Sequence, residues 1–323
     1  GNIMSVLIDG TAGIIVSGNT NTLSGVTVSR GGGSIATNTA VGASALAANT
    51  TGSRSVAVGD NALLVNTTGE RIVAVGSEAF TANTTGSYNT GVGWRVAQSN
   101  TSGLDNTAMG HTALTQNTTG SYNTSLGKES LFSNTTASNN TAVGYQAGYS
   151  NTTGANHTAF GKAALYANTT GTENSAFGLD ALTTNTTGNY NVAIGLGANK
   201  LNTTGSNNTS LGYLALLQNT TASNNTAVGY QAGFSITTGA WNTFLGHLSG
   251  YSTTGEGNCF VGRASGYNVT SGIRNTFIGA YNDSVGGAGQ VMTTGSKNTI
   301  IGSFTGNQGG LDIRTASNYI VLS

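Results

Sequence analysis

The sequence predicts an all-β chain that forms a parallel β-solenoid, or β-roll, of about sixteen 17-residue coils. Three observations lead to this prediction. One glycine recurs every 17 residues, a second glycine series runs ten residues behind it, and no 3.6-residue apolar period is present. Seventeen residues are too few for two helices, so each unit is interpreted as strand, turn, short strand, turn.

The first glycine series is unbroken from Gly42 to Gly246, a span of 204 residues or twelve units of 17. Three less regular copies follow, at Gly262, Gly279 and Gly302, after 16, 17 and 23 residues. We expect the glycines to supply the corners of each coil, where φ is positive. Coils stacked about 4.8 Å apart would then build a rod of roughly 75 Å.

Three columns of the repeat are predicted to point inward. They are the apolar residue before the first glycine, the small residue three positions after it, and the leucine that comes next. The first column is Val41, Val58, Val75, Val92, Met109, Leu126, Val143, Phe160, Phe177 and Ile194. The residue directly after the glycine varies too widely for a shared core position, from Asp60 to Trp94 and Lys128, so this column is predicted to face outward.

An asparagine recurs four residues before the first glycine, for example at Asn123, Asn140 and Asn191. Stacked amides can hydrogen-bond from coil to coil, which explains the repetition without a ligand. The N-T-T tripeptides match the N-glycosylation pattern, but their recurrence at the same turn indicates a structural role.

Three regions follow from the pattern. Residues 1–35 lack the repeat and are predicted to be a β-rich joint, residues 36–279 form the regular roll, and residues 280–323 form irregular last coils with an insertion and a closing strand. The chain begins at Gly1 rather than Met, from which we expect a processed or truncated product. The glycine run from Ser29 to Ser34 is interpreted as a hinge rather than a phosphate-binding loop, because no helix or P-loop lysine follows.

Composition excludes several function classes. Charged residues make up 7% of the chain, against about 25% in typical globular proteins, and Lys+Arg and Asp+Glu are both 11. No basic footprint for nucleic acid or anionic membranes exists, and no run of eighteen apolar residues predicts a membrane span. The single cysteine, Cys259, excludes an intrachain disulfide framework and is interpreted as a small residue in a column of threonines.

The strands Ser55–Gly59, Asn140–Gly144 and Asn191–Gly195 resemble the repeats of trimeric autotransporter adhesin heads. The longer form with N-T-T-G turns is similar to the arrays of bacteriophage tail fibres, as are the segments 29–33 and 317–323. The resemblance covers residues 36–323 and implies a left-handed roll wound as a homotrimer. The absence of a heptad stalk and of an anchoring barrel segment favours the phage fibre over the adhesin.

We therefore expect a homotrimeric tail fibre that is located on the virion, outside the cell, and joined to other tail proteins through its N-terminal end. A thin roll with an inner column of alanines offers too little core for one chain, which also favours a trimer. The expected partner is a host-cell surface receptor, a glycan or a protein, with the glycan preferred. One alternative is a bacterial trimeric adhesin on the cell surface; another is an ice-binding solenoid, because pairs such as Thr50-Thr51 stack.

No catalytic residues, metal ligands or cofactor are predicted. The three histidines, His111, His157 and His247, are interpreted as surface residues, and the acidic residues show no glycosidase pair. Exposed aromatic residues on a polar surface suit sugar stacking, and the insertion after Gly279 breaks the regular wall. The candidates for receptor binding are Trp94, Tyr145, Tyr213, Tyr230, Trp241, Tyr281, Asn282 and Asp283.

Overall fold

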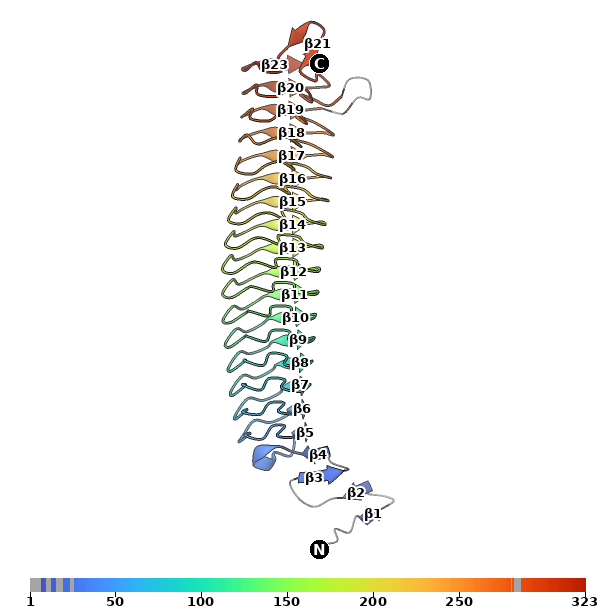
Figure 1. Ribbon diagram of the computed structural model, residues 1–323, viewed down its shortest axis with the longest axis vertical. Coiled ribbons are helices and arrows are strands. Elements are labelled where there is room, and N and C mark those ends of the chain that lie inside the picture. Colours follow the sequence, from blue (N-terminus) through green and yellow to red (C-terminus); the bar gives the residue numbers. More distant parts are fainter. Residues whose placement is uncertain (1–6, 10–12, 16–19, 24–25, 280, 282–285) are drawn as a thin grey trace. The chain divides into compact units, whose positions relative to one another are not determined.

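The computed structural model describes residues 7–9, 13–15, 20–23, 26–279, 281 and 286–323. The described residues form an all-β parallel solenoid of about sixteen coils, and their one helical segment is the short 3-10 turn η1 (Gly32–Ser34). The chain divides into two compact units, Gly1–Tyr122 and Asn123–Ser323. Figure 1 labels most strands of both units.

The first unit begins with two antiparallel pairs and continues as parallel coils. Strand β1 (Leu7–Asp9) pairs with β2 (Gly13–Ile15), and β3 (Thr20–Leu23) pairs with β4 (Val26–Ser29). Strand β4 then lies antiparallel to the first coil strand, β5 (Thr39–Val41). The remaining coil strands are β6 (Val56–Val58), β7 (Val73–Val75), β8 (Thr90–Val92) and β9 (Thr107–Met109).

The second unit is a longer stack of parallel strands. Its regular strands are β10 (Thr124–Leu126), β11 (Thr141–Val143), β12 (Thr158–Phe160), β13 (Ser175–Phe177), β14 (Val192–Ile194), β15 (Thr209–Leu211), β16 (Thr226–Val228), β17 (Thr243–Leu245), β18 (Cys259–Val261), β19 (Thr276–Ile278) and β20 (Thr299–Ile301). The hairpin β21 (Asn307–Gln308) and β22 (Leu311–Asp312) follows, and β23 (Ile320–Leu322) pairs with β20.

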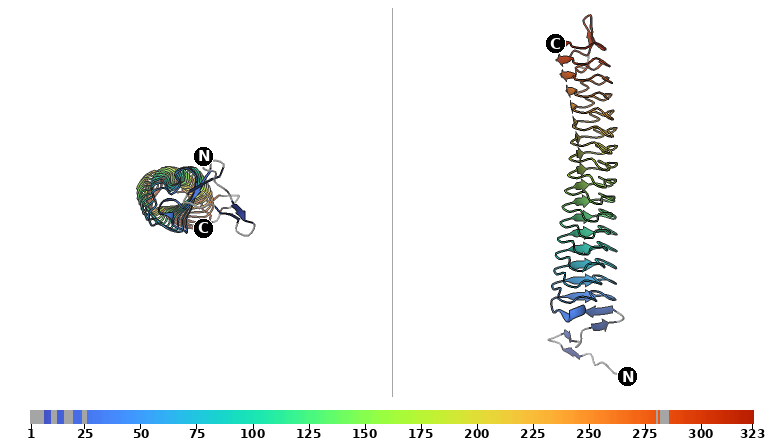
Figure 2. Two further views of the ribbon diagram at one scale, coloured as in Figure 1. Left: turned by 90° about the horizontal axis from the view of Figure 1, so that it is seen from below. Right: turned by 90° about the vertical axis from the view of Figure 1, so that its left-hand side faces the viewer.

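The predicted register is confirmed within each unit. Equivalent residues pair from coil to coil, as in Thr141 with Thr158 and Val143 with Phe160. Cys259 lies between Thr243 and Thr276, in the threonine column where it was predicted. Because every pairing joins equivalent positions, the strands of each unit line up along one side of the coils (Figure 2).

The second predicted strand of each unit is wrong. Each coil contains one three-residue strand, and the segment after its glycine is a series of turns. After β11, for example, Gln146, Gly148 and Asn156 have φ of 56°, 61° and 62°, in the left-handed region. A chain that repeatedly enters this region curls tightly and cannot run extended.

The two glycine series have different causes. Gly161, in the first series, has a φ of 137°, as predicted for a corner, and an added Cβ would lie 2.5 Å from the carbonyl oxygen of Gly178. Gly171, in the second series, is outside the positive-φ region, which corrects the expectation for that series. Its Cβ would lie 2.4 Å from the carbonyl oxygen of Gly188. The second series therefore reflects close contact between coils.

The core is narrow and is filled by complementary side chains. In several coils it consists of an alanine from the strand, such as Ala159, and an Ala-Leu pair after the corner, such as Ala164 and Leu165, and these three are at most 1% exposed. In β17 a phenylalanine, Phe244, replaces the alanine, and Gly250 stands where the leucine would be. An added Cβ on Gly250 would lie 2.4 Å from the Phe244 ring. The larger side chain at position 244 is therefore compensated by the missing side chain at position 250, which keeps the core volume of the coil nearly constant.

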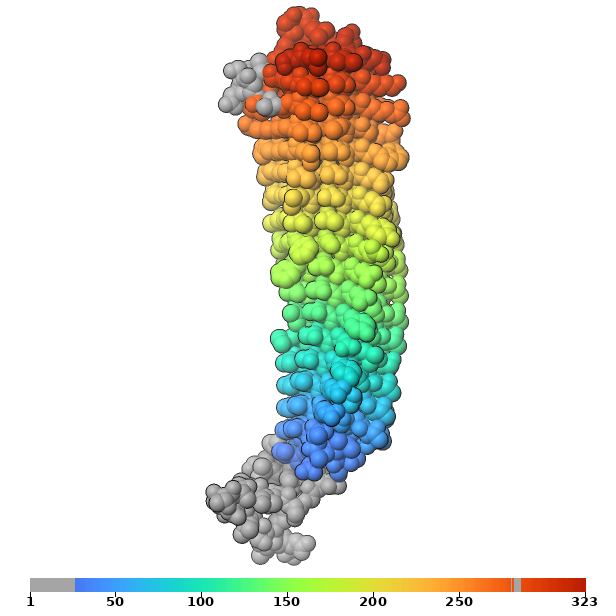
Figure 3. All heavy atoms as spheres, turned by 180° about the vertical axis from the view of Figure 1, so that it is seen from behind, coloured from blue at the N-terminus to red at the C-terminus, as the bar shows by residue number. Residues whose placement is uncertain are grey.

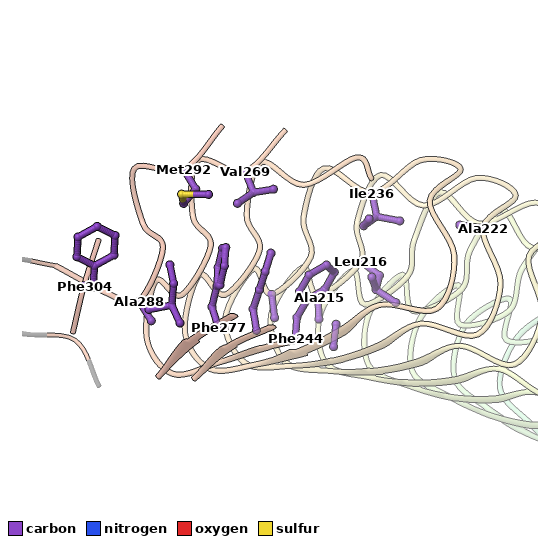
Figure 4. Close-up of a cluster of buried hydrophobic side chains, with 14 of the residues drawn as sticks. Ala215, Leu216, Ala222, Ile236, Phe244, Val269, Phe277, Ala288, Met292 and Phe304 are labelled. Atoms are coloured by element: carbon purple, nitrogen blue, oxygen red, sulfur yellow. The ribbon is translucent and has the colours of Figure 1, made fainter. Parts of the chain in front are cut away.

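The same exchange recurs at Phe260 with Gly266 and at Phe277 with Gly289. Together with Ile236, Val269 and Met292, which replace the turn asparagines, these rings make the C-terminal coils more apolar (Figure 4).

Two internal asparagine ladders run along the coils, and in the second unit the ladder at the N-T-T turns ends at Asn219. In the predicted ladder, which we call the inner ladder, the Asn140 Nδ2 donates to the carbonyl of Gly154 in the next coil, at 3.1 Å, and the Asn123 Oδ1 accepts the Asn140 N–H at 3.0 Å. The asparagines of the N-T-T turns form a second ladder, in which each Nδ2 donates to the Oδ1 one coil earlier and to a carbonyl of its own turn.

Candidate functional site

The strands place an apolar side chain on the outer surface at every coil. The predicted inward direction of the column before the first glycine is wrong, because none of these side chains is buried. In each strand the middle residue, such as Ala193, is buried, so alternation along the strand turns the next residue, such as Ile194, outward. We call this column the outer ladder. In the second unit it comprises Leu126, Val143, Phe160, Phe177, Ile194, Leu211, Val228, Leu245, Val261, Ile278 and Ile301.

The outer ladder is broadened in part of the second unit. Leu179 and Leu196, which directly follow the glycines of neighbouring coils, are 42% and 44% exposed. Phe177 and Ile194, on the strands beside them, are both 39% exposed. The space-filling view shows the side chains of each unit as tiers that repeat from coil to coil (Figure 3). A repeating apolar face of this extent is unusual on a monomeric soluble protein, where large patches mark interaction sites.

The aromatic candidates after the glycine are exposed, as predicted, but the structure does not gather them into one site. Trp94 lies in the first unit, with its ring 4.8 Å from the His111 ring and the Arg95 guanidinium 4.3 Å from its centroid. Tyr145, in the second unit, has the Lys128 ammonium 5.7 Å from its ring centroid. Both rings are thus partly covered by neighbours.

Tyr213 and Tyr230 stack on each other at 5.3 Å, and Tyr230 stacks on His247 at 5.1 Å. The faces of these rings are turned toward one another, which leaves mainly their edges for a ligand. Trp241 is on a different column and is the most exposed aromatic side chain described, at 63%.

The candidates near the insertion are only partly described. Tyr281 is half-buried, and the Arg263 guanidinium lies 4.0 Å from its ring centroid. Asn282 and Asp283 lie outside the described residues.

One aromatic column was missed by sequence reasoning. Phe132, Tyr149 and Tyr166 stack at centroid distances of 5.2 and 5.1 Å, five residues after the first glycine. Burial, and then the neighbouring Tyr166 hydroxyl, raise the pKa of Tyr149 above its usual value. A second stack comprises Phe234, Tyr251 and Tyr267. The recurrence of aromatic residues five positions after the first glycine could have predicted both stacks.

The histidines differ in burial. His111 and His247 are exposed, as predicted, whereas His157 is 3% exposed and occupies an asparagine position of the inner ladder. Its Nδ1 accepts the Asn174 N–H at 3.2 Å, and its ring also hydrogen-bonds to the backbone of Gly171. Desolvation lowers the pKa of His157 to about 4, because these contacts do not compensate for burial of the charged form.

Among the described residues, no three His, Cys, Asp or Glu side chains lie together as a metal site would require. The acidic side chains that are engaged contact neighbouring bases or amides. Glu78 accepts from the Arg95 Nε at 2.8 Å and from Gln98, and Asp180 accepts from the Lys200 Nζ at 2.9 Å.

The N-T-T turns are structural, as predicted. Asn66 and Asn83 are completely buried, so their amides are inaccessible in the folded coil. The first threonine of each pair also uses its hydroxyl internally, since the Thr67 Oγ1 donates to the carbonyl of Thr84 at 3.0 Å. This weakens the ice-binding alternative, because ordered water would need those hydroxyls.

The glycine run near the N-terminus is a cap rather than the predicted hinge. The Gly32 N–H donates to the carbonyl of Leu46 at 2.8 Å, and the Asn49 Nδ2 donates to the carbonyl of Gly32 at 3.4 Å. A Cβ on Gly31 or Gly33 would lie within 2.7 Å of the first coil. The small residues are therefore needed for the segment to pack against the open end of the coil.

No protein-family model, curated protein or solved structure matches this chain. Within the part of the chain that the structure describes, no helix has the length and apolar character needed to cross a bilayer.

Proposed function

We propose that the chain is a subunit of a homotrimeric fibre that projects from a phage virion and binds a receptor, a glycan in preference to a protein, on the host-cell surface. The observation that supports this proposal is the outer ladder. An apolar side chain at every coil is best covered by a partner that repeats with the same period, and another copy of this chain has that period.

The area of the outer ladder supports association between copies of the chain. At roughly 70 Å² of exposed surface each, the eleven side chains from β10 to β20 offer about 800 Å², close to what one partner contributes to a standard interface. Association would add the apolar burial that the narrow core of one chain lacks. A threefold arrangement follows the resemblance of the repeats to those of trimeric fibres.

The same arrangement serves a bacterial trimeric adhesin, which is the alternative. The resemblance to phage fibre arrays favours the virion, and its N-terminal end would then contact other tail proteins. Antibodies raised against the chain separate the two: label on virions supports the fibre, and label on bacterial surfaces without phage supports the adhesin.

Two measurements test the proposal. Light scattering should give a mass near three chains, and the labelled protein should bind saturably to intact host cells. A monomer that binds no cell would contradict the proposal.

A further inference from the structure

A second exposed column of the second unit has the composition of a ligand-binding strip. It lies two residues after the second glycine series, at the turn that leads into each strand, and we call it the corner column. On seven consecutive coils it holds Glu173, Tyr190, Asn207, Asn224, Trp241, Gly257 and Arg274, after Asn139 and Asn156 and before Lys297, and all except Gly257 are exposed. All have φ between 56° and 69°.

The aromatic residues of the corner column are not explained by the fold. Left-handed backbone is unfavourable for bulky residues and suits Asn and Gly, which hold this position at Asn207, Asn224 and Gly257. Most leucines in left-handed positions elsewhere, such as Leu165, are buried in the core, which accounts for them, and Leu214 and Leu248 are half-buried. Tyr190 and Trp241 are instead 53% and 63% exposed. Backbone strain combined with exposure points to an external contact.

The faces of these two rings are also available. Within the described residues, neither ring stacks on another ring or lies under a cation, in contrast to Trp94 and Tyr230. Gly257 places no side chain beside Trp241 on the next coil.

The polar members of the column have unused hydrogen-bonding capacity. In the described part of the chain, the side chains of Glu173, Asn207, Asn224 and Arg274 form no hydrogen bond or ion pair. The internal asparagines differ: the Asn168 Nδ2, for example, donates to both a side chain and a backbone carbonyl. The outward amides are thus free donors and acceptors between two exposed rings.

The backbone holds these groups in fixed positions. The N–H groups of Asn207, Asn224 and Trp241 each donate to a carbonyl of the preceding coil, at 3.0, 3.0 and 3.3 Å. Tyr190 and Trp241 are three coils apart, which corresponds to about 14 Å along the stack. Ring, amide, amide and ring therefore follow one another at the spacing of the coils.

We propose that the corner column from Glu173 to Arg274 binds an extended oligosaccharide that runs along the coils. The apolar faces of the sugars pack on Tyr190 and Trp241, and their hydroxyls hydrogen-bond to Asn207 and Asn224. Aromatic surface combined with a few placed polar groups is the usual composition of a small-ligand site. This assignment rests on the proposed receptor-binding function and specifies where the receptor binds.

Fluorescence can test the assignment directly, because the chain contains only two tryptophans, Trp94 and Trp241. In a Trp94→Phe protein, Trp241 is the single indole reporter. The probe is delipidated surface polysaccharide from cells that bind the labelled parent fibre. We expect a saturable change in Trp241 emission, and no such change would contradict the assignment.

Substitution supplies the second test. The Tyr190→Asn/Trp241→Asn protein should lose at least tenfold in affinity for the polysaccharide, with its assembled mass unchanged and its Tm unchanged or higher, because Asn suits the left-handed backbone. Tyr122→Asn, at the equivalent left-handed position of the first unit (φ 60°, 59% exposed), is the matched control and should bind like the parent.

The outcomes separate the two proposals. If the parent fibre binds cells and the double variant binds equally well, the corner column is not the site, whereas receptor binding stands. If the parent fibre binds no cell, the proposed function fails and the corner-column assignment fails with it.

Discussion

Phe160 and Phe177 lie one above the other on β12 and β13, with ring centroids 6.4 Å apart, and both rings face outward. The residues beside them, Ala159 and Ala176, are buried in the core. Because equivalent residues pair from coil to coil, each coil places an apolar side chain on the outer surface and a small side chain in the core. The outer ladder is a consequence of this register and extends over every coil of the second unit.

Protonation of His157 should weaken the fold in mild acid. Its folded pKa, about 4, is below the usual histidine pKa of 6.5, which applies to the unfolded chain. As the pH falls from about 6.5 to about 4, the unfolded chain binds a proton that the folded coil excludes, so the free energy of unfolding falls by about 3 kcal/mol. Denaturant titrations at several pH values can measure this loss.

The control is His157→Asn, which restores the usual residue of the inner ladder. Carboxylates contribute equally to the acid response of both proteins. The difference between the stability losses of the parent and of His157→Asn is therefore the contribution of His157. Equal slopes of stability against pH in this window would contradict the assignment.

Replacing a turn asparagine with aspartate should destabilise the ladder. The Asn83 Nδ2 donates to the Asn66 Oδ1 at 2.8 Å and to the carbonyl of Gly86 at 3.0 Å. In Asn83→Asp an oxygen would face both acceptors, and the buried charge adds a desolvation cost, so we expect a loss of about 3 kcal/mol or more. Thr85→Ala, at an exposed side chain of the same turn, should change stability by about 0.5 kcal/mol or less. Thermal unfolding of both proteins checks the contrast, and similar Tm values would refute the ladder's role.

The two glycine series should respond differently to alanine. Gly161→Ala combines a positive φ with a Cβ 2.5 Å from the Gly178 oxygen, so we expect a loss of about 2 to 3 kcal/mol. Gly171→Ala should cost less, because Ala137 and Ala222 already occupy the equivalent position in other coils and are accommodated there. Urea unfolding compares the two variants, and a larger loss for Gly171→Ala would contradict this distinction.

The sequence predicted the repeat, the register and the inner asparagine ladder, because a fixed 17-residue spacing allows only one way to align the coils. The direction of the outer ladder was predicted wrongly, since Val and Ile were expected in the core on hydrophobicity alone. Alternation along a three-residue strand decides the matter: once Ala142 is buried, Val143 must face outward. The narrow coil has room for an alanine at the middle position of the strand and for one leucine opposite that alanine.

The candidate site was predicted only in part. Exposure of Trp94, Tyr145, Tyr213, Tyr230 and Trp241 follows from the variable columns that they occupy. A ring in these columns is stacked when the residue one coil away is also aromatic or a histidine. The unstacked rings Tyr190 and Trp241 lie on left-handed backbone at the corner. The sequence pattern contains the first of these relationships, whereas the second is visible only in the backbone angles.

The solution mass of Ile194→Asp tests the central claim most directly, because Ile194 is 39% exposed and belongs to the outer ladder. We predict that the parent has a mass near three chains and resists SDS without heating. Ile194→Asp should be a folded monomer with the circular dichroism of the parent, as should Val143→Asp, and Lys128→Ala should assemble normally. A monomeric parent, or an Ile194→Asp protein that assembles like the parent, would contradict the account.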